Sequence, residues 1–385
     1  MSAKKILILG STGSIGKSAC NCVRRFKENF TITGLGAGSN ADLLAEQIKE
    51  FSPKHAYIAD SQKAAVLKEQ FGSKLTIYKG GQELERIVEE ADYDILLNAL
   101  VGAVGFRPTV LALKRGKKVA LANKESLVIG GDYITTLIKD DKERLMPVDS
   151  EHSAILQCLG SCEANSTVES LILTASGGPF RNLPKEQFSK ITVAQALNHP
   201  TWAMGKKITI DSSTLMNKGF EVIEARHLFS IPYSKIRVWI HPQSIIHSLV
   251  EFYDGSQIAQ LGLPDMELPI QYALSFPNRL PISGKRLSLP EIGKMEFSEP
   301  DFHRFPCLKL CIEAGETGGT APAVVNAANE AAVDLFLREK IGFTKISEIV
   351  AQALHNHKPQ KADSVEVIEL ADRETRQKIV ERYRH

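Results

Sequence analysis

The sequence predicts an α/β protein made of a doubly wound parallel sheet, a second, mixed sheet and a C-terminal helical region. As far as about residue 149, short apolar runs alternate with helical stretches of about ten residues, which is typical of parallel strands joined by helices. Strand-like runs with fewer helices between them follow over residues 150–275, which favours a mixed or antiparallel sheet. From about Pro300 onward the pattern is helical.

The individual elements are placed from apolar runs and from the turn residues that bound them. In the first part, buried strands are expected at residues 5–9, 31–35, 56–59, 94–98 and 118–122. Helices are expected between them at residues 14–26, 40–51, 63–70 and 108–115. In the second part, strands are expected at residues 170–174, 238–240, 246–252 and 257–261. In the last part, helices are expected at residues 323–339, 346–355 and 364–383.

These patterns predict a division into domains. A parallel-sheet domain covers residues 1–149, and an α+β domain with the mixed sheet covers residues 150–275. Residues 276–300 are expected to be a linker, because Pro277, Pro281 and Pro290 resist regular helix there. A helical domain covers residues 301–385.

Composition and charge are those of an ordinary globular protein, with 43% hydrophobic and 24% charged residues. The net charge of +2 gives no broad attraction to nucleic acid or to membranes, and no apolar run is long enough to span a bilayer. The N-terminus leads directly into an apolar strand and lacks a signal-peptide pattern, so a cytoplasmic location is expected. Cysteines such as Cys158 and Cys162 lie in apolar helical patterns and are expected to be reduced and packed.

A glycine-rich loop follows the first predicted strand and opens the first predicted helix. Gly10, Gly13 and Gly16 permit a tight turn and close backbone approach, and the helix N-terminus offers N–H groups to a pyrophosphate. The spacing differs from the commoner G-x-G-x-x-G, and a plain strand-to-helix turn is the alternative. The second strand ends without the carboxylate that usually holds an NAD ribose. Ser39 and Asn40 can instead donate hydrogen bonds to a 2′-phosphate, which favours NADP over NAD.

Two carboxylates stand where the parallel sheet is expected to end. In an extended chain, residues i and i+2 point to the same side, so Asp149 and Glu151 can bind one cation together. Ligands gather at the carboxyl ends of parallel strands, although paired carboxylates are also common on surfaces. His152 faces away from the carboxylates in an extended segment, and we do not count it as a ligand.

Two segments further along favour a ligand site, one as a turn that can bind an anion and the other as a lid. The turn Ala175–Phe180 contains two glycines after a strand and exposes backbone N–H groups and a hydroxyl, with a purely structural turn as the equal alternative. The polar segment 198–207 is interrupted by Pro200 and carries Trp202, whose large ring favours a lid over a ligand.

One predicted helix face combines a cation, an amide and a carboxylate. Asn217, Lys218 and Glu221 lie three or four positions apart, so they share a face of a helix. They can hold a phosphate or hydroxyl groups and add a third metal ligand. A simple Lys–Glu surface pair is the alternative.

Motifs in a fixed order from the first strand to the helical C-terminus resemble the 1-deoxy-D-xylulose 5-phosphate reductoisomerase family. They are Gly10–Gly16, Leu121–Ser126, Pro147–His152, Ala175–Phe180, His199–Trp202, Met216–Glu221, Thr317–Pro322 and Asn326–Glu330. The resemblance implies an N-terminal Rossmann-like domain that binds NADPH, a central catalytic domain with the interface of a homodimer, and a C-terminal helical domain. It also implies conversion of 1-deoxy-D-xylulose 5-phosphate to 2-C-methyl-D-erythritol 4-phosphate, the committed step of non-mevalonate isoprenoid biosynthesis.

The resemblance also implies roles for individual residues. Mg²⁺ or Mn²⁺, with Co²⁺ as a further candidate, would be bound by Asp149, Glu151 and Glu221. These three residues, Lys124 and His199 would form the catalytic set. The phosphorylated sugar would contact Lys124, Ser150, Glu151, Ser176, His199, Ser212, Asn217, Lys218 and Glu221. NADPH would contact Thr12, Gly13, Ser14, Ile15, Gly38, Ser39, Asn40, Asn123, Glu125 and Gly205, and a flap would carry Trp202 and Met204. In one departure, Ser39 stands where many members have a lysine, which leaves open how the 2′-phosphate is neutralised.

Two other functions compete with this interpretation. Another two-domain NADP-dependent dehydrogenase would share the glycine loop, but would not be expected to carry a three-carboxylate metal site. A non-catalytic, nucleotide-sensing Rossmann protein would also have no need of one. Convergence of Asp149, Glu151 and Glu221 is therefore the discriminating feature.

Overall fold

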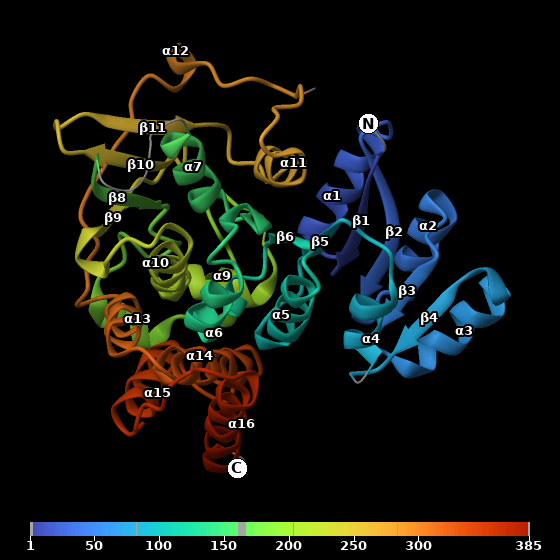
Figure 1. Ribbon diagram of the computed structural model, residues 1–385. Helices are drawn as coiled ribbons and strands as arrows, with labels where there is room; N and C mark the ends of the chain where they lie inside the picture. Colours follow the sequence, from blue (N-terminus) through green and yellow to red (C-terminus); the bar gives the residue numbers. More distant parts are fainter. Residues whose placement is uncertain (1–2, 82, 161–166, 203, 283, 384–385) are drawn as a thin grey trace. The chain divides into compact units, whose positions relative to one another are not determined.

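The computed structural model describes residues 3–81, 83–160, 167–202, 204–282 and 284–383 (Figure 1). The chain divides into two compact units. Unit 1 comprises Met1–Ser126, Thr136–Asp149 and Met266–Ile282, and unit 2 comprises Leu127–Thr135, Ser150–Asp265 and Ser283–His385. Residues 266–275, which the sequence assigned to the second domain, pack within unit 1. The division of the later residues into a catalytic and a C-terminal domain stays a prediction.

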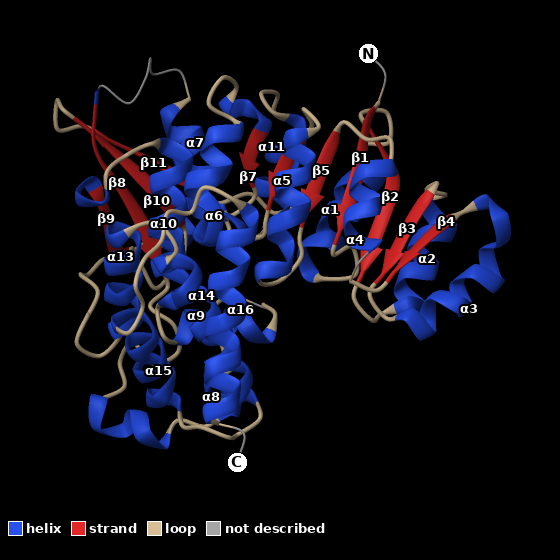
Figure 2. Cartoon of the chain, turned by 60° about the horizontal axis from the view of Figure 1, so that its bottom comes forward, coloured by secondary structure: helices blue, strands red, loops and turns tan. Residues whose placement is uncertain are grey.

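Unit 1 contains a seven-stranded sheet in the order β4-β3-β2-β1-β5-β6-β7, and all its strand pairs are parallel (Figure 2). The strands are β1 (Lys4–Leu9), β2 (Phe30–Ala37), β3 (His55–Ile58), β4 (Thr76–Lys79), β5 (Ile95–Asn98), β6 (Lys118–Leu121) and β7 (Leu145–Pro147). The predicted α/β class and parallel sheet are confirmed. Strands β4 and β7 were not predicted, because the first is a short, half-exposed edge strand and the second has only three residues.

Helices flank this sheet. They are α1 (Ser14–Arg25), α2 (Ala41–Phe51), α3 (Ser61–Phe71), α4 (Glu83–Glu90), α5 (Phe106–Lys114) and α11 (Glu267–Ser275). Helix α6 (Lys124–Leu137) begins in unit 1, and its residues 127–135 belong to unit 2. Helix α4 was not predicted, because its apolar period extends over only eight residues. It nevertheless buries an apolar stripe of Leu84, Ile87 and Val88.

The strand order creates a switch point beside β1. The chain leaves β1 through α1 to β2 on one side, and β5 lies on the other side of β1. In open parallel sheets, ligands bind outside the carboxyl ends of the strands at such a point. The glycine loop after β1 therefore lies where a nucleotide is expected.

Unit 2 contains a four-stranded mixed sheet in the order β11-β10-β8-β9. Its strands are β8 (Val168–Ala175), β9 (Ile236–Ile240), β10 (Ile246–Phe252) and β11 (Gln257–Leu261). Strand β10 is antiparallel to β8 and to β11, whereas β8 and β9 are parallel. The prediction of a mixed sheet is confirmed.

The remaining helices of unit 2 are α7 (Ser150–Leu159), α8 (Val193–Ala196), α9 (Lys206–Ser213), α10 (Met216–Phe229), α12 (Leu289–Ile292), α13 (Pro306–Thr317), α14 (Ala321–Leu337), α15 (Phe343–His355) and α16 (Val365–Arg382). Helix α14 packs against α15 and α16, which are drawn in orange and red in Figure 1. The ring of Phe343 at the start of α15 lies within 6.0 Å of the rings of Phe180, Phe188 and Phe336. This aromatic cluster fixes α15 to the segment that follows β8.

Two further expectations concern single features. The cysteines that the structure describes are reduced and buried, and Cys162 lies outside the described residues. Among the described residues, no helix combines the length and the apolar character that crossing a membrane requires.

Candidate active site

The glycine loop after β1 has a backbone shape that excludes side chains. Gly10 has φ +87°, and a Cβ there would lie 2.3 Å from the carbonyl oxygen of Ala99. A Cβ on Gly16 would lie 2.2 Å from the carbonyl oxygen of Gly10. The buried Ser11 hydroxyl donates to Gln47 Oε1 (2.8 Å), and the Gln47 amide donates back to the Ser11 carbonyl oxygen (2.9 Å). The loop is therefore held against α2, with the start of α1 accessible to an anion.

The predicted cofactor residues after β2 form an exposed turn. Gly38, Ser39 and Asn40 are all exposed, and a Cβ on Gly38 would meet no atom within 4 Å. Asn40 caps α2, since its side-chain oxygen accepts from the backbone N–H of Leu43 (3.2 Å). The amino group of the Asn40 amide is the part of this side chain that can donate to a phosphate.

Asn123 and Glu125 are buried rather than exposed at the carboxyl end of β6. The Asn123 amide donates to the carbonyl oxygens of Leu100 and Gly102, both at 2.9 Å, and to Glu125 Oε2 (3.1 Å). A Cβ on Gly105 would lie 2.4 Å from the Asn123 side chain. Asn123 therefore shapes the loop after β5, and the contact of Asn123 and Glu125 with NADPH stays a prediction.

Lys124 and Asp149 meet within unit 1. Lys124 begins α6 after β6, and Asp149 follows β7, the neighbouring strand. The Lys124 ammonium donates to Asp149 Oδ2 at 2.9 Å, and Lys124 is only 6% exposed. The carboxyl ends of two adjacent parallel strands thus bring a buried cation and a carboxylate together.

Within unit 2, a buried lysine bridges two of the predicted metal ligands. Lys218 Nζ donates to Glu151 Oε1 (2.8 Å) and to Glu221 Oε2, and it is 3% exposed. Burial by itself would lower the pKa of Lys218, but the two carboxylates more than offset this, and the net pKa is raised. The ammonium is therefore charged, and it balances two carboxylates that would otherwise repel each other.

Asn217 completes this face of α10. Its amide donates to Glu221 Oε1 (2.6 Å), so both oxygens of Glu221 accept a hydrogen bond. Asn217 Oδ1 is buried and has no hydrogen-bond partner among the described residues. The predicted grouping of Asn217, Lys218 and Glu221 on one face is present, and it points into the unit rather than to solvent as a surface pair would.

Two of the three predicted metal ligands, Asp149 and Glu151, lie at the start of α7, and the third, Glu221, lies on α10. Asp149 is the last residue before α7, so the chain itself holds it next to Glu151. One carboxylate oxygen each from Asp149, Glu151 and Glu221 lies within 4.8 Å of the other two. Ser150 lies between the first two and donates to Glu151 Oε2 at 2.6 Å. Three carboxylates at this spacing are a donor set suited to a hard divalent cation.

The geometry that we used to pair Asp149 with Glu151 was wrong. The sequence was interpreted as extended, whereas α7 begins at Ser150, so Glu151 and His152 lie in its first turn. An acidic residue followed by a run of helix-forming residues is a helix start, and this signal was overlooked. The two carboxylates converge because the chain turns from β7 into the helix, not because of a two-residue repeat.

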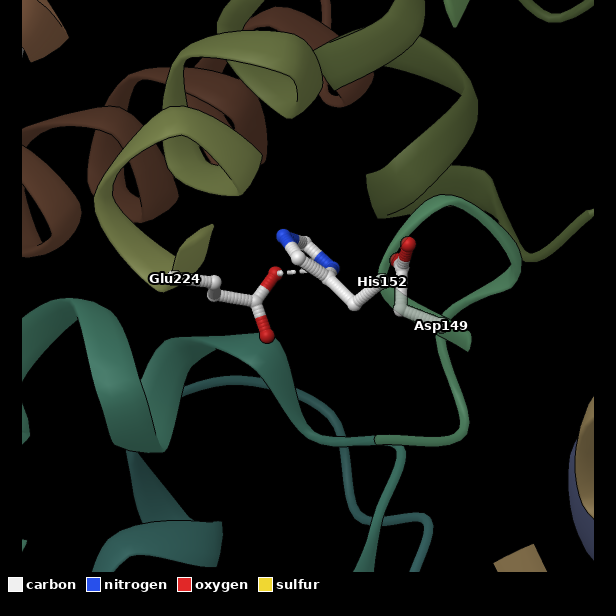
Figure 3. A group of neighbouring side chains, drawn as sticks. All are labelled: Asp149, His152 and Glu224. Carbon is white, nitrogen blue, oxygen red and sulfur yellow. Dashed lines mark ion pairs between the residues drawn. The ribbon is translucent and has the colours of Figure 1, made fainter. Parts of the chain in front are cut away.

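His152, which we had excluded, is fully buried next to the carboxylates. One ring nitrogen, Nε2, lies 2.9 Å from the main-chain carbonyl oxygen of Glu221, and Nδ1 lies 3.8 Å from Glu224 Oε2. Figure 3 shows His152 and Glu224 facing each other beside Asp149. Because a carbonyl oxygen only accepts, Nε2 carries the proton and donates. This bond ties α7 to α10 and so fixes Glu151 relative to Glu221.

A second cluster in unit 2 joins three residues of the predicted anion site. His199 Nε2 lies 3.1 Å from both Ser176 Oγ and Ser212 Oγ. Gly178 has φ +67°, and a Cβ there would lie 2.8 Å from the carbonyl oxygen of Ser212. The double-glycine turn is therefore needed for its shape and also brings the Ser176 hydroxyl to α9.

The protonation of His199 follows from its partners. Nδ1 accepts from the backbone N–H groups of Thr201 (3.1 Å) and Trp202 (2.9 Å), which can only donate. The ring is therefore neutral with its proton on Nε2, where it can donate to a serine hydroxyl or to an anion. Burial, with a smaller contribution from the positive charge of Arg181, lowers the pKa of His199 and favours this neutral form.

The predicted flap residues lie in the segment that joins His199 to α9. Trp202 is partly buried with its ring 6.3 Å from that of His247, Met204 is partly buried, and Gly205 is exposed at the N-cap of α9. Their role as a flap stays a prediction, as does the contact of Gly205 with NADPH.

Helix α9 is also anchored from the C-terminal helices, through residues that the sequence interpretation missed. Asp211, 1% exposed, pairs with Lys207 (2.8 Å) and accepts from the Asn329 amide of α14 (2.7 Å). The neighbouring Ser212 is thereby held facing His199. Lys207 follows the predicted flap and could by its position bind an anion, but its ammonium already pairs with Asp211.

Family models cover most of the chain. Three models match: 1-deoxy-D-xylulose 5-phosphate reductoisomerase at residues 6–131, its C-terminal domain at residues 145–229, and the DXP reductoisomerase C-terminal domain at residues 261–378. A 1-deoxy-D-xylulose 5-phosphate reductoisomerase of Chloroherpeton thalassium is 51% identical over 380 residues, which is 98% of each chain. One of Caldanaerobacter subterraneus is 52% identical over 381 residues, which is 99% of each chain.

The chain belongs to the 1-deoxy-D-xylulose 5-phosphate reductoisomerase family.

Solved structures of reductoisomerases have the same fold. The enzyme from Zymomonas mobilis in complex with NADPH is 39% identical, with a TM-score of 0.91 over the whole of both chains. A DOX-P reductoisomerase in complex with NADPH, fosmidomycin and magnesium is 38% identical, with a TM-score of 0.94 over 99% of this chain and 98% of that one. The resemblance inferred from the motifs is confirmed over the full length.

Proposed function

We propose that this chain isomerises and reduces 1-deoxy-D-xylulose 5-phosphate to 2-C-methyl-D-erythritol 4-phosphate, with NADPH as reductant and a divalent cation as cofactor, in non-mevalonate isoprenoid biosynthesis. The observation that carries the proposal is the convergence of Asp149, Glu151 and Glu221, which neither alternative function requires. Membership of the family over the whole chain supports it.

The residues present fit a divalent cation. Carboxylate oxygens are the ligands that Mg²⁺ and Mn²⁺ take, and Asp149, Glu151 and Glu221 would hold the ion. Asn217 Oδ1, which is buried and has no hydrogen-bond partner among the described residues, is a neutral oxygen donor beside Glu221. When bound, the cation supplies Lewis-acid stabilisation of oxyanionic charge. Lys124, fixed by Asp149, places a positive charge beside that carboxylate.

The phosphate of the substrate would bind at the cluster of Ser176, His199 and Ser212. Two hydroxyls and a neutral imidazole N–H converge there, and each can turn its hydrogen to a phosphate oxygen. Asn217 and Lys218 on α10 would bind the same end of the substrate. Binding energy from the phosphate, which does not react, can be used to orient the reacting carbons.

The exposed start of α1 would bind the NADPH pyrophosphate, and the turn after β2 would bind the ribose. The nicotinamide itself supplies the hydride. The chain has to place this ring, and the buried network around Asn123 gives the loop after β5 a fixed shape for that purpose.

The direct test is an assay of NADPH oxidation with the purified protein. The absorbance of NADPH should fall only when 1-deoxy-D-xylulose 5-phosphate is added. The product should be 2-C-methyl-D-erythritol 4-phosphate. Oxidation of NADPH driven by a semialdehyde instead, or NADPH binding with no turnover of the ketose phosphate, would contradict the proposal.

Replacement of His199 by glutamine is expected to raise the KM for the ketose phosphate about tenfold or more, with the KM for NADPH unchanged. Glutamine cannot accept from two backbone N–H groups at one end and donate to the serines at the other. Steady-state kinetics with each substrate varied in turn measure the effect. The control is His355→Gln on α15, an exposed site outside the cluster.

The same histidine predicts a pH dependence. Its pKa is lowered from the ordinary 6.5, so the neutral form is favoured in the fold. The hydrogen bonds of neutral His199 therefore contribute fully to substrate affinity above pH 6.5. This contribution is lost as the pH falls through the lowered pKa. Substrate affinity attributable to His199 should therefore be flat near neutrality and decline only in more acidic buffer, with no such decline in His199→Gln.

We also propose that the protein is a homodimer in the cytoplasm. Strand β11 forms an edge of the mixed sheet, with Ile258 46% exposed, and Tyr253 at the end of β10 is 62% exposed. An open edge with exposed apolar side chains is a surface that proteins usually cover. Light scattering on the eluted protein measures the mass, and a monomer at micromolar concentration would contradict the dimer.

A further inference from the structure

We propose that Lys63 binds the 2′-phosphate of NADPH and determines the preference of this chain for NADPH over NADH. The proposal rests on the proposed NADPH dependence and assigns one residue to it. In dinucleotide-binding sheets, the turn after the second strand recognises the 2′ group of the ribose. In this chain the turn after β2, residues 38–40, contains no lysine or arginine.

Lys63 reaches this turn from the next helix of the sheet. It lies in the first turn of α3, and its ammonium donates to the main-chain carbonyl oxygen of Ser39 at 2.6 Å. The side chain is exposed, and that oxygen is its one hydrogen-bond partner within the part of the chain that the structure describes. An ammonium has three donors, so further hydrogens remain for a phosphate bound at Ser39 and Asn40.

The charges of the neighbouring acidic residues favour a cation at this turn. Asp42 lies in the first turn of α2, directly after the turn in the chain. Asp60, the N-cap of α3, lies beside the turn in space, since its backbone N–H donates to the Gly38 carbonyl oxygen. Without Lys63, a phosphate dianion at Ser39 and Asn40 would face the negative charges of Asp42 and Asp60.

The two arginines of α1 are already engaged. Arg24 donates to both oxygens of Glu50, at 2.5 and 2.7 Å, and Arg25 pairs with Glu267. A bidentate carboxylate partner occupies the fork of donors that would otherwise bind a phosphate. The ammonium of Lys63, in contrast, has no carboxylate partner among the described residues.

Lys63 thus compensates for Ser39. A lysine at position 39 would carry its charge on the turn itself, whereas in this chain the charge comes from the neighbouring βα unit and is held in place by the backbone of Ser39. A lysine at position 39 and a lysine at position 63 should then be interchangeable as the cation that binds the 2′-phosphate. A contact that only held α3 against the turn would not predict this.

The test compares ligands that differ by one phosphate. Lys63→Met is expected to weaken binding of 2′,5′-ADP about tenfold by calorimetry, to leave 5′-AMP unaffected, and to raise the KM for NADPH but not for NADH. The difference should shrink at high salt because the site is exposed. Lys68→Met on the same helix is the matched control.

The decisive variant is Lys63→Met combined with Ser39→Lys, which should restore the affinity for 2′,5′-ADP and the preference for NADPH. Equal weakening of phosphorylated and unphosphorylated ligands by Lys63→Met would show a structural role and overturn the proposal. So would an unchanged preference. Failure of the proposed function itself looks different, because the wild-type protein would then bind NADPH without turning over the ketose phosphate, or would not bind it.

Discussion

Removal of divalent cations is expected to abolish NADPH oxidation by this chain, and addition of Mg²⁺ or Mn²⁺ is expected to restore it. Three carboxylates within 4.8 Å of one another are costly to hold together, and the protein itself contributes the ammonium of Lys218 to offset them. No catalytic advantage follows from such a cluster unless a cation there stabilises charge that develops on the substrate.

The measurement is the initial rate after dialysis against EDTA and after graded addition of each cation. Binding of NADPH, followed by its fluorescence, should survive the treatment, since the glycine loop and the turn after β2 contain no metal ligand. Full activity in metal-free buffer would remove the cation from the reaction. Loss of NADPH binding together with activity would point to unfolding instead.

Replacement of Glu221 by glutamine is expected to lower kcat about 100-fold or more and to leave NADPH affinity unchanged. Glu221 is 1% exposed, and its two oxygens accept from Asn217 and Lys218. The amide keeps the size of the side chain but removes the charge that binds a cation. It also has only one acceptor oxygen, so it cannot accept from both Asn217 and Lys218 as the carboxylate does.

The control for this variant is Glu348→Gln on α15, an exposed position that pairs only with Lys345 among the described residues. Circular dichroism and the melting temperature separate loss of catalysis from loss of fold. Activity close to wild type in Glu221→Gln would exclude this residue as a metal ligand. A kcat that recovers at high Mg²⁺ would instead indicate weakened metal affinity.

Much of the fold was predictable because it depends on local patterns. Continuous apolar runs such as residues 6–9 are buried on both faces of a parallel sheet, and the glycine after them marks the turn. Strand β4 lacks this signal, since only Tyr78 of its four residues is buried. Helix α4 has the apolar spacing of Leu84, Ile87 and Val88 over only eight residues, so its helical period is short.

The sequence predicted candidate residues for the site but not how their side chains meet. Motifs identified Glu151, Glu221 and His199, whose side chains lie in clusters within unit 2. The buried bond from His152 to α10, and the reach of Lys63 to the turn after β2, join residues 69 and 24 positions apart. No spacing rule relates residues so far apart, because the packing of whole helices decides which of them meet.

Gly178 and Gly38 differ in the substitutions that their surroundings allow. A side chain at Gly178 would meet the backbone of α9, since a Cβ there would lie 2.8 Å from the carbonyl oxygen of Ser212. A Cβ at Gly38 would meet no atom within 4 Å. The turn after β2 can therefore accept substitutions that the turn after β8 cannot, and we expect the preference for a nicotinamide coenzyme to be easier to change by mutation than the recognition of the sugar phosphate.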